Sequence, residues 1–165
     1  MAEPRKVTLI SQQGDEFEVD VAVACMSTLV KTMVEEDEDC HESIPLPNVE
    51  TNILRKVIEY CEHHYNNPPD EIPKPLKSSN LAEVVSEWDY QFINDNSDQK
   101  VLFALILAAN YLNIKPLLDL SVAKVATMVK GQTAEEIRRR FSIVNDFTPE
   151  EEAQVREENK WCEDA

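Results

Sequence analysis

A nearly continuous apolar run at residues 101–120 constrains the fold more than any other part of the chain. Its first half, V-L-F-A-L-I-L-A-A, leaves no polar face in a helix, and a helix that is apolar all round is expected to be buried all round. Polar residues near its end make the run too short to span a bilayer, which needs about 18–20 apolar residues. We therefore predict a buried core helix, capped by Asp98 or Ser97, and a second helix that starts at Pro116.

The residues before this run alternate between strand and helix patterns. Two period-two segments flank a turn that contains Gly14, which is typical of a β-hairpin. A short segment interrupted by prolines is typical of an edge strand. The predicted elements are strands at 6–11, 17–21 and 43–46 and helices at 26–36 and 50–63.

Ser27 is the predicted cap of the first of these helices, and the acidic block that follows it, at 35–39, is predicted to be a solvated loop.

Periodicity fails at residues 66–97. Four prolines between 68 and 75 exclude a helix there, and an irregular segment of this length inside a domain is usually an insertion or a functional loop. We expect at most a helical turn at 81–85. The aromatic residues Trp88, Tyr90 and Phe92 are expected to anchor the segment to the core.

The C-terminal part carries unusually complete helix signals. Gly131 is predicted to end the helix at 116–130. Capping boxes at Thr133–Glu136 and Thr148–Glu151 predict two further helices, the second with Pro149 in its first turn. That last helix, 149–160, has almost no apolar residues and buries too little to offset its ordering entropy alone.

We therefore expect the last helix to fold fully only against a partner, with Trp161 as the anchor, since tryptophan dominates interface hot spots. The apolar faces of the two preceding helices either close on each other or leave an apolar groove. Asn110 and Tyr111 either end the core helix at the surface or take part in binding.

Charge and glycine content exclude several function classes. The 165 residues carry a net charge of −16, which repels phosphate backbones and disfavours nucleic-acid binding. The two glycines, at 14 and 131, are too far apart to build a phosphate-binding loop. The N-terminal M-A-E-P-R-K lacks an apolar segment typical of a secretory signal, so we expect a reducing compartment with free thiols.

Catalytic and metal sites have weak support. Cys61, His63 and His64 are close in sequence, but adjacent histidines point about 100° apart on a helix and cannot share one metal. The acidic runs lack the spacing of calcium loops. We expect no metal, no cofactor and no catalytic residue; an enzyme using Cys61 or Cys162 would need a thiol of low pKa.

Five sequence motifs together indicate a family. They are I-P-L-P-N-V at 44–49, L-I-L-A-A-N-Y-L at 105–112, I-K-P-L-L-D at 114–119, E-E-I-R at 135–138 and N-D-F-T-P-E-E-E-A-Q-V-R-E-E-N-K-W-C at 145–162. Through these motifs the sequence closely resembles the family of S-phase kinase-associated protein 1, the F-box-binding adaptors of SCF-type ubiquitin ligases. Residues 66–87 depart from the family pattern, and Ala134 stands where a proline is common.

The resemblance implies an α+β protein: a BTB/POZ domain at 1–130, a small sheet packed with helices that includes the variable Pro-rich loop at 66–97, and a helical F-box-binding extension at 131–165. It implies a non-catalytic adaptor in the cytoplasm and nucleus that links F-box substrate receptors to a cullin scaffold, with no nucleic acid or membrane as partner. The implied F-box-binding residues are Val125, Val129, Ile137, Phe141, Ile143 and Trp161, and the implied cullin-binding residues are Asn110, Tyr111, Ile44 and Pro45.

Two further expectations follow from the resemblance. The proline at the position of Pro149 is hydroxylated and glycosylated in some protist members, although a proline here also serves simply to start a helix. The free adaptor is a possible homodimer. The alternative functions are a self-associating BTB scaffold or an elongin-C-like adaptor with other receptors, against which the Trp161-bearing tail argues.

Overall fold

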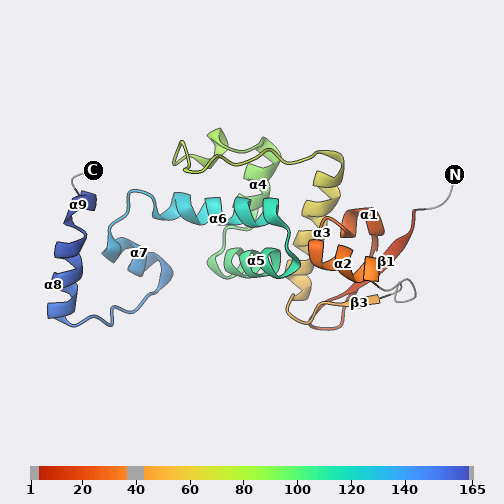
Figure 1. Cartoon of the computed structure of the whole chain (residues 1–165), viewed down its shortest axis with the longest axis horizontal. Coiled ribbons are helices and arrows are strands. Elements are labelled where there is room, and N and C mark those ends of the chain that lie inside the picture. The colour runs from red at the N-terminus through yellow and green to blue at the C-terminus, as the bar shows by residue number, and fades with distance from the viewer. Residues whose placement is uncertain (1–3, 37–42, 164–165) are drawn as a thin grey trace. The chain divides into compact units, whose positions relative to one another are not determined.

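The computed structural model describes residues 4–36 and 43–163 of the chain. The chain forms two compact units, Met1–Lys130 and Gly131–Ala165. The first holds a small sheet with helices α1 to α6, and the second holds helices α7 to α9 (Figure 1). Each unit is described by itself below.

The sheet has the predicted hairpin and the predicted edge strand. Strands β1 (Lys6–Ile10) and β2 (Glu16–Asp20) pair antiparallel around a turn in which Gly14 has a φ of 88°. Strand β3 (Ser43–Pro45) pairs parallel with β1, which gives the order β2-β1-β3. One face of the sheet is buried through alternate side chains, and these are Val7, Leu9, Val19 and Ile44.

Two helices lie between β2 and β3, and a third follows β3. Helix α1 (Val21–Ala24) is a single turn that the sequence patterns did not predict. Helix α2 (Thr28–Glu36) starts two residues later than expected and has the predicted cap, because the Val30 N–H donates to Ser27 Oγ at 3.2 Å. Helix α3 (Thr51–Asn66) extends past its predicted end.

The segment 66–97 is more ordered than its prolines suggested. A 3-10 turn, η1 (Leu81–Glu83), lies where a helical turn was expected. The prediction was wrong for α4 (Glu87–Asp95), a helix that is capped by Ser86, whose Oγ accepts from the Asp89 N–H. Nine residues form a marginal helix alone, so tertiary packing stabilises α4, since Phe92 and Ile93 are buried.

The core helix α5 (Gln99–Leu112) begins at the predicted Asp98 cap, whose carboxylate accepts from the N–H groups of the first turn. It packs against α2, α3 and α6 (Lys115–Val129). The expectation that α5 is buried all round was wrong, because Leu107 is 69% and Phe103 37% exposed. Its neighbours cover the other faces and leave this one open.

In the second unit, α7 (Ala134–Phe141) and α8 (Pro149–Glu158) both begin with the predicted capping boxes. The last predicted helix is divided, because α8 ends at Glu158 and a short helix α9 (Lys160–Glu163) carries Trp161. Neither α7 nor α8 has a buried residue.

Part of the predicted acidic loop lies outside the described residues. Glu35 and Glu36 end α2, whereas residues 37–39 and Cys40 are not described. Within the described ranges, no helix is long and apolar enough to cross a membrane.

Candidate functional site

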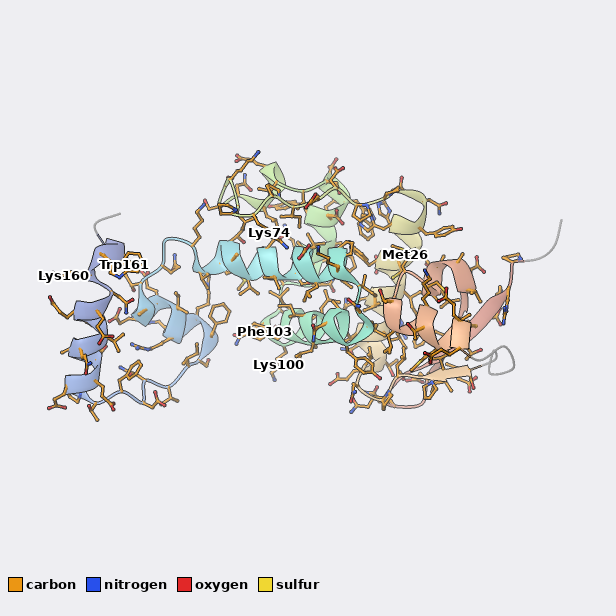
Figure 2. All side chains as sticks on the ribbon, viewed as in Figure 1. Met26, Lys74, Lys100, Phe103, Lys160 and Trp161 are labelled. Atoms are coloured by element: carbon orange, nitrogen blue, oxygen red, sulfur yellow. The ribbon has the colours of Figure 1, made fainter. Side chains whose placement is uncertain are left out.

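The second unit presents large apolar side chains at its surface. Trp161 lies on α9 (Figure 2). Its side chain is 72% exposed, and Ile143, which follows α7, is 53% exposed. Ile137 and Phe141 lie one turn apart on α7 and are half-buried. The family resemblance implied F-box binding for all four, and they provide an apolar surface that this unit covers only in part.

Ion pairs join α7 to α8. Arg156 contacts both Glu135 and Glu152, and Arg138 lies 3.6 Å from the Glu152 carboxylate. A backbone hydrogen bond at Glu135 and the adjacent Arg156 lower the pKa of the Glu135 carboxyl. The two helices border a cleft of about 780 Å³ whose lining includes Phe147. The ion pairs at the rim of the cleft and the apolar side chains beside it are features of a site that could bind a segment of a partner protein.

The remaining two predicted F-box residues lie on α6, in the first unit. Val125 and Val129 are one turn apart, half-buried, and therefore share a face of that helix. Val122, one turn earlier than Val125, is 47% exposed and was not predicted to bind. The predicted F-box residues are thus divided between the two units.

A second apolar surface lies on α5. Leu107, Asn110 and Tyr111 share one helix face by their spacing, with Asn110 exposed and Tyr111 half-buried. Leu107 also lines a groove of about 270 Å³ between α5 and the start of α3, together with Ala104 and Val49. This face carries both residues of α5 that were predicted to bind the cullin.

The strand residues of the predicted cullin site differ from each other. Pro45 is exposed on β3. Ile44 is only 4% exposed and packs in the core opposite Leu9. Ile44 therefore positions the strand. Of these two residues, only Pro45 is accessible to a binding partner.

The cysteine and histidine cluster of α3 has structural roles. Burial raises the pKa of the Cys61 thiol to about 12, which keeps it protonated and opposes its use as a nucleophile. His63 stacks on Trp88, and both ring nitrogens of His64 are hydrogen-bonded. Among the described residues, no group of three or more His, Cys, Asp or Glu side chains could hold a metal ion.

The exposed fractions of apolar side chains reveal candidate binding residues that the sequence patterns missed. Leu107 and Phe103 were assigned to the core because they lie in the apolar run, and Val144 and Phe147 belong to no periodic pattern. Phe147 did have a signal, since it precedes the capping residue Thr148 in the N-D-F-T-P-E motif. The exposure of the other three has no counterpart in the sequence pattern.

Two family models match the chain. The model of the Skp1 family tetramerisation domain matches residues 5–66, which cover the sheet and α1 to α3. The model of the Skp1 family dimerisation domain matches residues 115–162, from α6 to α9. The predicted class, an α+β POZ fold with C-terminal helices, is confirmed.

Curated relatives match over almost their whole length. The S-phase kinase-associated protein 1 homolog of Tetrahymena thermophila is 56% identical over 161 residues, which are 97% of this chain and 95% of that protein. The E3 ubiquitin ligase complex SCF subunit sconC of Arthroderma otae is 48% identical over 159 residues, covering 96% and 95%. Suppressor of kinetochore protein 1 of Schizosaccharomyces pombe is 48% identical over 163 residues, covering 96% and 98%. The chain therefore belongs to the Skp1 family.

Proposed function

We propose that this protein is the non-catalytic adaptor of an SCF-type ubiquitin ligase, linking F-box substrate receptors to a cullin scaffold. The observation that carries the proposal is the presence of two exposed apolar surfaces on different elements, one on α5 and one on α7 to α9. An adaptor needs two independent docking surfaces. Relatives named as SCF subunits, among them SCF ubiquitin ligase complex protein SKP1a of Dictyostelium discoideum, support the assignment.

The receptor is proposed to contact the second unit and, on the first unit, the face of α6 that carries Val125 and Val129. Trp161 is the anchor of this contact, because a tryptophan that is 72% exposed gains much from burial by a partner. Ile143 and Phe147 extend the apolar area beside it. The other proposed contacts are Val125, Val129, Ile137 and Phe141.

The cullin surface is proposed to centre on α5. Leu107 is its most exposed apolar residue, at 69%, and Asn110 and Tyr111 flank it on the same face. Pro45 on β3 is a further candidate. The net charge of −16 favours approach to a basic partner surface and raises the association rate more than the affinity.

The adaptor itself performs no chemical step in this proposal. It holds the receptor, and thus the substrate, near a ubiquitin-charged enzyme, which is catalysis by proximity within an assembly. The neutral, buried Cys61 thiol supports a non-catalytic role. We further propose that the adaptor acts in the cytoplasm and the nucleus, which imaging of the tagged protein in its native host would test.

Self-association is a second candidate activity of the free protein. The matching family models are described as a dimerisation domain and a tetramerisation domain. The exposed apolar side chains of α9 and of the segment before α8 would be covered in a homodimer. Sedimentation of the free chain, with and without an F-box domain, distinguishes a dimer that the receptor replaces from one that it does not.

Pro149 is a candidate for hydroxylation and glycosylation. Its ring is exposed in the first turn of α8, next to the capping residue Thr148. The simpler role of this proline is to start the helix. Intact mass of the protein purified from its native host tests the modification, and an unmodified mass refutes it.

A three-component binding experiment tests the adaptor function. A cullin N-terminal domain is immobilised, and retention of an F-box domain is measured with and without the full chain. We expect retention only when the chain is present. Leu107→Asp should abolish retention on the cullin while direct binding to the F-box domain persists. Binding of the chain to only one of the two partners would refute the adaptor function.

A further inference from the structure

A buried histidine–aspartate pair joins two helices that are distant in sequence. His64 lies in the last turn of α3, and its Nε2 is 2.7 Å from Oδ1 of Asp89 in the first turn of α4. The two side chains are 3% and 9% exposed. Neither role proposed above uses this pair.

The hydrogen-bond partners require both nitrogens of His64 to carry a proton. Nδ1 lies 2.7 Å from the backbone carbonyl of Asn67, which can only accept. Nε2 faces an oxygen of Asp89, and an ionised carboxylate also only accepts. The other oxygen of Asp89 is already engaged, since it accepts from Ser86 Oγ at 3.0 Å. The geometry is therefore that of an imidazolium between two acceptors.

The groups around His64 leave Asp89 as its main charge partner. From α3, the Tyr60 ring centroid lies 4.4 Å and the His63 ring centroid 4.9 Å from that of His64. Burial raises the pKa of the Tyr60 hydroxyl far above its usual value, so it stays neutral, and the Cys61 thiol of α3 is neutral as well.

The other elements near His64 contribute Trp88, from α4, and one further carboxylate. Asp70, from the segment after α3, lines the same cleft of about 230 Å³ as His64 and Asp89. Asp119 of α6 acts on Tyr60. The groups that raise the pKa of His64 are Asp89 and Asn67, so Asp89 is its charge partner.

Opposing effects act on the protonation of His64. Burial by itself lowers its pKa, but the hydrogen bonds to Asp89 and Asn67 and the charge of Asp89 together raise the pKa above its usual value. Because the folded pKa is higher than the unfolded one, the stabilisation is fully present below a pH of about 6.5 and is lost as pH rises through the folded pKa.

We propose that His64 and Asp89 form a proton-dependent clamp that fastens α4 and residues 67–86 to the end of α3. Loss of the proton leaves one imidazole lone pair facing an acceptor at 2.7 Å, either the Asn67 carbonyl or the Asp89 carboxylate, in a buried site, which is costly. Helix α4 in turn contacts α6, where Lys124 Nζ donates to Asn94 Oδ1 at 2.7 Å. Opening of the clamp therefore removes a support of α6 while the packing of α3 on α5 persists.

The experiment combines imidazole ¹⁵N NMR with hydrogen exchange between pH 6 and 9 on the full chain. In the wild type, both nitrogens of His64 should be protonated at pH 7. Protection of α4 amides, corrected for intrinsic exchange, should fall by about tenfold or more as pH rises, while that of α5 amides stays constant. A neutral His64 imidazole at pH 6 overturns the proposal without any variant.

Two neighbouring substitutions provide a matched comparison. His64→Gln should leave α4 weakly protected at all pH values and remove the pH dependence. His63→Gln, at the adjacent position, should retain the wild-type pH dependence. If the protection of α4 amides fell equally with rising pH in the wild type and in His64→Gln, the proposal would be overturned.

Discussion

Replacing Trp161 by alanine should weaken binding of an F-box domain by about 2 kcal/mol or more, the scale of an interface hot spot. Trp161 is 72% exposed on the short helix α9, so the free protein gains little from it. The variant should therefore unfold at the same denaturant concentration as the wild type. The loss should appear only in the complex.

The magnitude follows from the exposed area of this side chain. A large aromatic side chain buries about 150–250 Å² in all, and 72% of this area remains available for a partner. Burial of roughly 110–180 Å² at about 25 cal/mol per Å² gives about 3–4 kcal/mol. Ordering of the side chain at the interface costs about 1 kcal/mol. The remainder corresponds to a roughly 30-fold or larger increase in Kd.

Calorimetric titration of each purified variant with an F-box domain and with a cullin N-terminal domain measures the effect. Leu107→Ala is the matched control, because Leu107 is a similarly exposed apolar residue, at 69%, on α5. Trp161→Ala should weaken only receptor binding, and Leu107→Ala only cullin binding. An unchanged receptor affinity for Trp161→Ala, with both proteins folded, refutes the reasoning about the anchor.

Three further predictions concern the fold and its coupling to binding. Leu105→Ala removes a fully buried side chain of α5 and should destabilise the protein by about 2–5 kcal/mol in urea unfolding; a loss below about 1 kcal/mol would contradict the placement of the core. Thr148→Ala removes half of a capping box and should cost about 1 kcal/mol of α8 stability, seen as faster exchange in 149–158, whereas Thr32→Ala, at an exposed site of α2, should not change that exchange. Exchange in residues 131–163 should slow strongly when an F-box domain binds, because α7 and α8 have no buried residue in the free chain; full protection without a partner would favour the homodimer.

The expected losses of binding free energy for Trp161 and Leu107 depend on how exposed these side chains are. The sequence did not predict an exposed side chain on α5. An apolar helix has no polar stripe to mark its solvent-facing side, so the run at 101–112 predicted burial on every face. In the folded unit, α2, α3 and α6 cover the other faces and leave Leu107 open. The apolar pattern therefore predicted burial, and only the folded unit shows which side chains of the run remain exposed.

Interactions between near neighbours in the chain were readable from sequence. Both capping boxes join residues three positions apart, and the hairpin joins strands across a short turn, so residue type and spacing suffice. The edge position of β3 likewise followed from its prolines, because proline cannot donate to a sheet. The family motifs added the POZ fold, which the family models and the structure confirm.

Contacts between residues far apart in the chain were decided only by the tertiary structure. Helix α4 was missed because its stability comes from burying Phe92 and Ile93 rather than from a long periodic pattern. Ile44 was assigned to a binding surface, yet its side chain packs in the core. The pair of His64 and Asp89, separated by 25 residues, forms only once α3 and α4 meet, because a sequence carries local spacing but not which distant side chains share a buried site.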